Sequence, residues 1–133
     1  MKCIVKTKSE ALAYNHVQES HSIISITQIG VPIREIALSR NDNTQGVLLL
    51  AFDDDNTSFS KEHAQQIKEF VEHHLSQGTE TFIIHCLLGM ARSPAVAAAL
   101  CKYYTDDDAI WFRTKTPNMH VYRILLDTLY GEQ

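Results

Sequence analysis

One short segment of the chain combines residue types at a spacing that can do chemistry on an oxyanion. Residues 85–93 read HCLLGMARS, so that Cys86 precedes Arg92 by six positions. A cysteine thiolate is a strong nucleophile, and a planar guanidinium can hold two oxygens of a phosphate at once. The pair predicts nucleophilic attack on a phosphate that the arginine holds in place.

The residues between this pair would complete an anion-binding loop. A turn from a strand into a helix aims successive backbone N–H groups at one point, next to the positive end of the helix dipole. Gly89 would let the backbone curl closely around the anion. Ser93 would donate a hydrogen bond to the sulfur. The predicted phosphate-binding residues are Leu87, Leu88, Gly89, Met90, Ala91 and Arg92.

The elements that must position this loop follow from the apolar pattern. Residues 3–6 and 22–27 are rich in β-branched or apolar side chains, which is typical of strands. Residues 47–52 and 81–85 are continuous apolar runs, so we expect both to be strands buried on both faces. The reactive loop directly follows the last of these strands.

Helices are predicted between and after the strands. Ser9 can cap a helix that runs to Val17, and Ser60 can cap a second helix whose apolar stripe recurs at helical spacing up to Leu75. Residues 95–103 are nearly all helix formers. Two further helices are expected at 109–113 and from Asn118 onward.

This alternation indicates an α/β fold with a central, largely parallel sheet of four to five strands flanked by helices. At 133 residues the chain fits a single domain, 1–133. In such sheets ligands bind beyond the carboxyl ends of the strands. The loops that follow His85 and Phe52 both lie there, so the chemistry is expected between them.

The composition limits the kinds of binding partner and the cellular compartment that we expect for the protein. A net charge of −4 gives no general attraction to nucleic acid or to anionic membranes, and no apolar run approaches a membrane span. The three cysteines, Cys3, Cys86 and Cys101, have no paired spacing, which favours a reducing, cytoplasmic setting. The seven histidines show no spacing of metal ligands, so we expect neither a metal nor another cofactor.

The pattern His-Cys-x-x-Gly-x-x-Arg-Ser resembles the signature of the cysteine-based protein tyrosine phosphatase superfamily. From residue 22 to about 130 the chain is similar to the compact, dual-specificity-like phosphatases of bacteria and phages. It carries the strand Ile24-Ser25-Ile26, the loop Phe52-Asp53-Asp54 and the pair Pro117-Asn118 in the order found there. The resemblance implies a phosphomonoester hydrolase that forms a phosphocysteine intermediate on Cys86, with His85 as the supporting residue that orients the loop.

Residues 85–93 are called the signature loop below, and the resemblance also implies a general acid on the loop after the preceding strand. Asp53, Asp54 and Asp55 compete for this role. Asp54 takes the third place of Phe-x-Asp and is the preferred acid, with Asp53 as the main rival. Neighbouring like charges are expected to raise the pKa of a carboxyl in this cluster, which favours its protonated form.

Alternative functions for this loop have less support in the sequence. A rhodanese-like sulfurtransferase has a shorter spacing between cysteine and arginine, and the low-molecular-weight phosphatases carry the motif near the N-terminus. A catalytically inactive phosphate-binding module remains an alternative, although the cysteine, arginine and acid are all present. The expected substrates are phosphorylated proteins or small aryl phosphates, with phosphotyrosine favoured and phosphoserine or phosphothreonine also able to enter.

Overall fold

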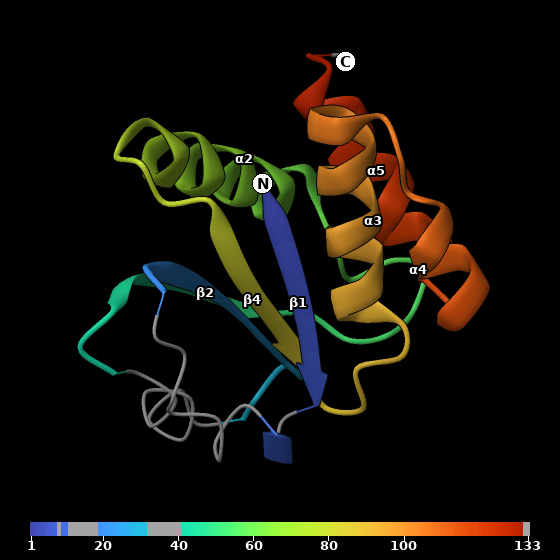
Figure 1. The fold of residues 1–133 in the computed structure, drawn as a ribbon. Helices are drawn as coiled ribbons and strands as arrows, with labels where there is room; N and C mark the ends of the chain where they lie inside the picture. The colour runs from blue at the N-terminus through green and yellow to red at the C-terminus, as the bar shows by residue number, and fades with distance from the viewer. Residues whose placement is uncertain (8, 11–18, 32–40, 132–133) are drawn as a thin grey trace.

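The structure is a computed structural model, and it describes residues 1–7, 9–10, 19–31 and 41–131. Four strands and four helices are defined in these ranges (Figure 1). The strands are β1 (Lys2–Thr7), β2 (His21–Thr27), β3 (Thr44–Ala51) and β4 (Thr81–Cys86). The helices are α2 (Lys61–Ser76), α3 (Arg92–Thr105), α4 (Ala109–Thr114) and α5 (Met119–Leu129).

The strands form one parallel sheet in the order β1-β4-β2-β3. Its register places Val5, Ile84, Ile24 and Leu48 side by side in one row across the sheet. Strand β4 therefore lies between β1 and β2, and all six of its residues are buried. Because all strands run the same way, the loops after β3 and β4 leave from the same end of the sheet (Figure 1).

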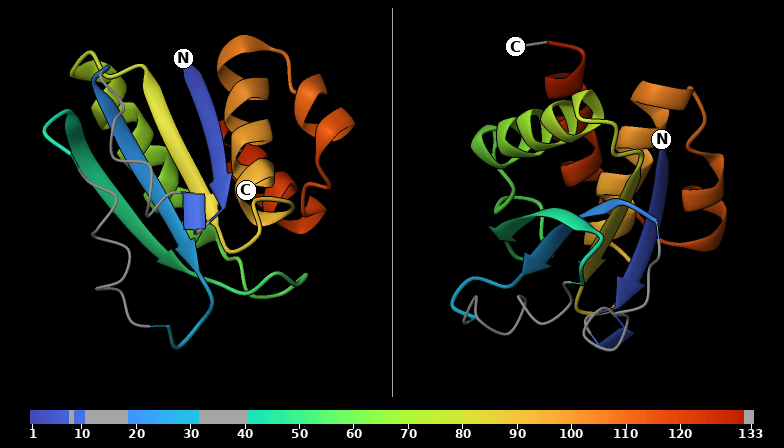
Figure 2. Two further views of the ribbon diagram at one scale, coloured as in Figure 1. Left: turned by 60° about the horizontal axis from the view of Figure 1, so that its bottom comes forward. Right: turned by 60° about the vertical axis from the view of Figure 1, so that its left-hand side comes forward.

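Helices α2, α3 and α5 lie on one face of the sheet (Figure 2). The main hydrophobic core fills the space between that face and the helices, and it includes Ile84, Ile24, Phe52 and Leu100. The opposite face carries a smaller cluster around Ile23 and Ile83. Alternate residues of a strand point to opposite faces, which is why consecutive isoleucines of β2 and β4 contribute to both clusters.

The predicted fold class is confirmed, with some corrections in detail. Strand β3 is not buried on both faces, since Val47, Leu48 and Leu49 are only half-buried. The reason is that β3 is an edge strand of the sheet as described, with β2 as its one neighbour. The helix predicted from Ser9 to Val17 falls mostly outside the described residues.

The helix starts differ in how they are capped. The Ser60 side chain accepts a hydrogen bond from the His63 N–H at the start of α2, and Asn118 caps α5 through Val121. Helix α3 begins after Ala91, which has no side chain able to cap it. The N–H groups in the first turn of a helix have no partner within the helix, so the start of α3 is left open to a ligand.

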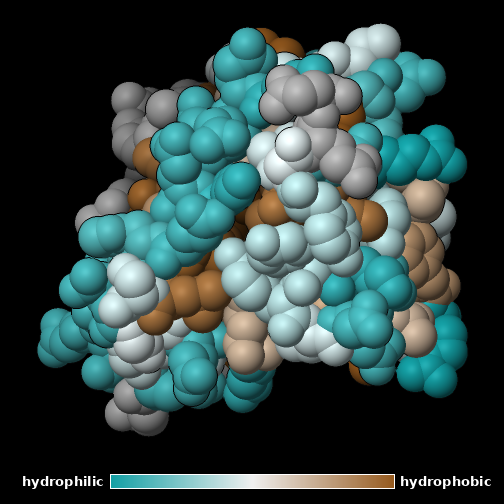
Figure 3. Space-filling model, turned by 90° about the horizontal axis from the view of Figure 1, so that it is seen from above, coloured by the Kyte–Doolittle hydropathy of each residue, from teal (hydrophilic) through white to brown (hydrophobic). Residues whose placement is uncertain are grey.

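The face seen from the amino-terminal ends of the strands is mostly hydrophilic, with hydrophobic side chains in the hollows between polar ones (Figure 3). Over the part of the chain that the structure describes, none of the helices has the length and apolar character needed to cross a bilayer.

Candidate active site

The signature loop starts and ends at buried residues of regular elements. Cys86 is the last residue of the central strand β4 and Arg92 is the first residue of α3, and both are buried. Between them Gly89 has a φ of +67°, a conformation that L-residues rarely adopt. A Cβ atom at this position would stand 3.3 Å from the backbone carbonyl group of Lys6. The loop therefore requires glycine both for its conformation and for its contact with β1.

The backbone of the loop is open to an acceptor. Within residues 1–7, 9–10, 19–31 and 41–131, the N–H groups of residues 87–91 donate no hydrogen bond. They lie next to the uncapped start of α3, where the helix dipole is positive. Backbone N–H groups seek acceptors, so this loop is a ready-made site for an anion.

Cys86 has one polar partner in this loop. Its Sγ lies 3.0 Å from the Oγ of Ser93, which is fully buried in the first turn of α3. A hydrogen bond joins the two atoms, and both residues are buried. The predicted contact between Ser93 and the Cys86 sulfur is thus present in the geometry.

Arg92 connects the signature loop with the aspartate-bearing loop. Its Nη1 donates a hydrogen bond of 3.0 Å to the carbonyl oxygen of Phe52, the residue just before Asp53. Only 5% of the Arg92 surface is exposed, although no carboxylate pairs with it in the described part of the chain. A buried and unneutralised guanidinium favours binding of an anion.

The three neighbouring aspartates have different surroundings. Asp53 accepts a hydrogen bond from the backbone N–H of Ile29, which fastens it to the end of β2. Asp55 accepts from the N–H groups of Ser58 and Thr57, and these bonds lower the pKa of its carboxyl group. Asp54 is the one of the three that lines the same pocket as Cys86. For Asp55 the effect is opposite to the raised pKa expected from charge crowding, because its hydrogen bonds stabilise the ionised form.

Asn118 holds the aspartate loop against the signature loop. Its Nδ2 donates to Asp54 Oδ1 at 2.9 Å and to the carbonyl oxygen of Asp55 at 2.8 Å. Its backbone N–H donates to the carbonyl oxygen of Ala91 at 3.0 Å, and its Oδ1 caps α5 through Val121. The Asn118 side chain thus caps α5 and also holds the loop that carries Asp54 and Asp55.

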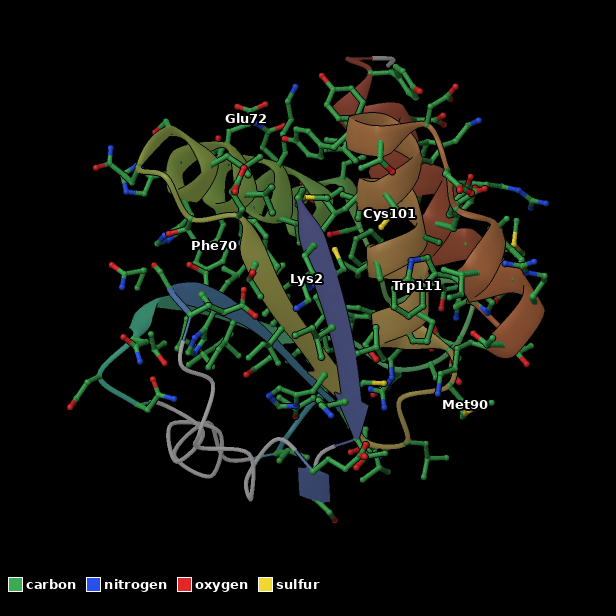
Figure 4. The ribbon with its side chains drawn as sticks, in the orientation of Figure 1. Lys2, Phe70, Glu72, Met90, Cys101 and Trp111 are labelled. Atoms are coloured by element: carbon green, nitrogen blue, oxygen red, sulfur yellow. The ribbon has the colours of Figure 1, made fainter. Side chains whose placement is uncertain are left out.

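The pocket over Cys86 has a volume of about 220 Å³. Its rim is apolar, since Leu87, Leu88 and Met90 are all exposed there. Met90 extends outward from the loop between β4 and α3 (Figure 4). The residues that line the pocket are Gln28, Asp54, Cys86, Leu87, Leu88, Met90, Ala91 and Arg92. The structure adds Gln28 to the candidate site residues. Nothing in the sequence distinguishes it from other polar residues that follow a strand.

His85 lies behind the loop rather than in the pocket. It is buried, and its Nε2 lies 2.6 Å from the Oγ of Ser25 on the neighbouring strand β2. Ser25 belongs to the Ile24-Ser25-Ile26 strand on which the family resemblance partly rests, but the sequence alone does not indicate what its side chain does. The contact depends on the register in which β2 pairs with β4, which brings Ser25 and His85 face to face. His85 is thus placed to fix the end of β4 through its buried partner.

Comparisons with known proteins agree with this geometry at the level of the fold. No family model and no curated protein sequence matches the chain. Solved structures do match. Human DUSP28 superposes with a TM-score of 0.69 at 14% identity, covering 97% of this chain and 92% of that one. The PTP-2 phosphatase of Cydia pomonella has a TM-score of 0.68 at 17% identity, covering 95% and 84%.

A third match is the human tyrosine phosphatase-like serine/threonine/tyrosine-interacting protein, with a TM-score of 0.60 at 20% identity over 94% of this chain and 85% of that one. Sequence identities this low support a shared fold but do not establish a shared activity. The signature loop, the parallel sheet and these matches together show that the chain has the fold of the compact, dual-specificity-like members of the protein tyrosine phosphatase superfamily.

Proposed function

We propose that the protein is a cysteine-dependent phosphomonoester hydrolase of the protein tyrosine or dual-specificity type. The observation that carries this proposal is the run of backbone N–H groups at residues 87–91 that lack a hydrogen-bond partner among the described residues, between Cys86 and the buried guanidinium of Arg92. Such donors suit the equatorial oxygens of a transferring phosphoryl group, where the charge is spread over three atoms.

In the first step the Cys86 thiolate attacks phosphorus in line with the leaving oxygen. The bond from phosphorus to that oxygen breaks, and the carboxyl group of Asp54 gives its proton to the departing alcohol or phenol. The product is a phosphocysteine. The N–H groups of residues 87–92 and the Arg92 side chain hold the equatorial oxygens throughout.

In the second step the ionised Asp54 takes a proton from a water molecule, which attacks phosphorus and releases inorganic phosphate. The bond that breaks joins phosphorus to the sulfur of Cys86. The Ser93 hydroxyl donates its hydrogen bond to the sulfur as negative charge returns to it, which is supported by their 3.0 Å separation. His85 and Asn118 act as positioning residues, because they reach the reacting atoms only through other groups.

The substrate we propose is a phosphorylated protein or a small aryl phosphate. The apolar rim supports this choice, since Leu87, Leu88 and Met90 would pack against a phenyl ring and offer nothing to additional phosphates. A phosphate-binding module without hydrolysis is the second candidate. It is favoured by the likeness to a protein that is described as phosphatase-like and interacting.

The deciding experiment is hydrolysis of 4-nitrophenyl phosphate between about pH 5 and pH 8 with EDTA present. We expect turnover by the wild type, no turnover by Cys86→Ser, and a large loss in Asp54→Asn but not in the matched variant Asp53→Asn. Vanadate binding that persists in a wild type without turnover would identify a binding module instead. A loss in Asp53→Asn alone would move the general acid by one residue.

A further inference from the structure

A second and larger cavity lies beside the pocket over Cys86, and we call it the side groove. Its volume is about 710 Å³. The residues that line it are 54–56, Ala91, 116–120, Arg123 and Ile124. Asp54 and Ala91 line both cavities, so the side groove adjoins the place where the proposed chemistry occurs. The proposed reaction gives no role to most of these residues.

Hydrogen bonds tie the walls of the side groove together. The loop after β3 reaches the start of α5, where the Asn118 side chain holds it (Figure 1). The backbone N–H of Asn118 donates to the carbonyl oxygen of Ala91 at 3.0 Å. His120 Nε2 donates to the carbonyl oxygen of Phe59, also at 3.0 Å. Because these contacts already fix the walls, a ligand that binds there has less ordering to impose.

One face of α5 forms a wall of the side groove. Residues 119–120 and 123–124 are about one helical turn apart, so they share a face of the helix. The opposite face is buried in the core through Val121, Leu125 and Leu129. The side groove therefore runs along the less buried face of α5.

Arg123 gives the side groove a positive charge without a partner. It is the one arginine or lysine among the described residues that line the groove. Its side chain is exposed, and no carboxylate in the described ranges pairs with it. Asp54 and its neighbour Asp55 place negative charge at the end that adjoins the Cys86 pocket. The groove thus suits a ligand whose negative charge lies away from that end.

We propose that the side groove binds the polypeptide of a phosphorylated protein beside its phosphorylated residue, and that Arg123 selects an acidic side chain in that segment. This inference rests on the proposed function. It adds to that function which sequences around the phosphorylated residue the site prefers.

The size of the side groove favours a polypeptide over a small ester. The pocket over Cys86 has about 220 Å³, and a small aryl phosphate placed there would leave the 710 Å³ beside it empty. The lining combines polar side chains, such as Asn56 and Thr116, with apolar ones, such as Met119 and Ile124. This mixture suits a peptide, which has polar backbone groups and apolar side chains.

The separation of the charges sets the spacing in the substrate. Asn118 donates to Asp54, and Arg123 follows Asn118 by five residues, a rise of about 7.5 Å along α5. An extended peptide covers roughly 3.3 Å per residue. The acidic side chain is therefore expected about two to four positions from the phosphorylated residue. Directly beside that residue, the carboxylates of Asp54 and Asp55 would repel it.

The test measures binding, so that it does not require turnover. Phosphotyrosine peptides with alanine at the flanking positions carry one glutamate, moved to successive positions on either side, and matched peptides carry glutamine instead. Fluorescence anisotropy gives their affinities for the full chain with Cys86→Ser. We expect glutamate at about two to four positions on one side to bind roughly threefold to fivefold tighter than glutamine, as for a favourable exposed ion pair. Added salt should weaken this preference.

Matched charge variants in the Cys86→Ser background assign the preference to one residue. Arg123→Gln should bind the glutamate and glutamine peptides equally. Lys68→Gln removes one positive charge from α2, outside the residues that line either cavity, and should keep the preference. The inference is overturned by a preference that survives in Arg123→Gln, by one that peaks directly beside the phosphotyrosine, or by none at any position.

The proposed function is judged separately, from hydrolysis of 4-nitrophenyl phosphate by the wild type. Turnover without a preference for glutamate would overturn the role of the side groove and keep the hydrolase. A preference that depends on Arg123 in a protein without turnover would keep the side groove and identify a phosphopeptide-binding module.

Discussion

Arg92 donates a hydrogen bond to the carbonyl oxygen of Phe52, and the side chain thereby ties the signature loop to the start of the aspartate loop. The bond uses Nη1 and leaves the rest of the guanidinium group without a hydrogen-bond partner among the described residues. The arginine therefore has two tasks. It holds the aspartate loop in position, and in the proposed function it presents a planar fork to the phosphate.

Replacing Arg92 by lysine keeps the charge but removes the fork. We expect kcat/KM for 4-nitrophenyl phosphate to fall by about 10²-fold or more, the size of loss seen when one transition-state donor is removed. Steady-state kinetics measure this, with vanadate affinity as a second readout. A lysine variant with nearly full activity would mean that charge alone, without planar geometry, meets the need of the site.

Asn118 is expected to affect the acid as well as the helix. Asn118→Ala removes the α5 cap and both hydrogen bonds from Nδ2 to the aspartate loop. The lost cap should cost about 1 kcal/mol of unfolding free energy. Activity on esters with poor leaving groups should fall more than activity on 4-nitrophenyl phosphate, because only the former depend on a positioned acid.

The matched control for this prediction is Asn118→Ser, because serine also caps helices but cannot reproduce the amide donor. We expect its thermal stability to stay close to that of the wild type while its dependence on the leaving group follows that of the alanine variant. Equal behaviour of the wild type and Asn118→Ser toward poor leaving groups would limit Asn118 to the role of a cap.

Ser93→Ala should slow the breakdown of the phosphocysteine more than its formation. The Ser93 hydroxyl is the one side chain hydrogen-bonded to the Cys86 sulfur among the described residues, and the sulfur needs a donor most when it leaves. Stopped-flow measurements should show a burst of 4-nitrophenol followed by a slow steady state. A variant in which burst and steady state decline together would place the effect of Ser93 in the first step.

A comparison of Gly89→Ala with Gly78→Ala separates the cost of a strained backbone conformation from the cost of a steric clash. Both glycines have positive φ, +67° and +92°, and an added Cβ meets the Lys6 backbone only at position 89. Each alanine should cost roughly 1–2 kcal/mol of stability through its backbone conformation. Only Gly89→Ala is expected to lose vanadate affinity, which isothermal titration can measure, because only there must the anion-binding loop shift.

The stability of the protein should depend on pH through Cys101. Its pKa is about 6 in the folded protein, below the ordinary value of a thiol, so the unfolded state binds more protons between these two values. The unfolding free energy should therefore rise as pH increases from about 6 towards 9, and this contribution is lost as pH falls through about 6. The nearby charged groups are the amino group of Met1 and the carboxylate of Asp107.

Urea unfolding of the wild type and of Cys101→Ser at several pH values measures this dependence. The serine variant should lack the rise, because a hydroxyl group does not ionise in this range. A rise of the same size in both proteins would assign it to other groups.

Much of the site could be predicted from the sequence, because the signature loop is a local structure. Cys86, Gly89, Arg92 and Ser93 are close in the chain, and a strand that turns into a helix brings their groups to one point. The strands were also predicted to within a few residues, since apolar and β-branched runs mark them regardless of their neighbours. The amino-acid sequence thus determined by itself the fold class and the local course of the loop for which anion binding is predicted.

Tertiary structure decided whatever depends on contacts between distant segments. Asp53, Asp54 and Asp55 are chemically identical, and the partners supplied by Ile29, Asn118 and the Ser58 turn give each of them a different environment. Strand β3 has the composition of a central strand, but the strand order places it at an edge. The packing of α3 against β1 likewise requires that β1 pairs with β4, a long-range arrangement that no local pattern of residues encodes.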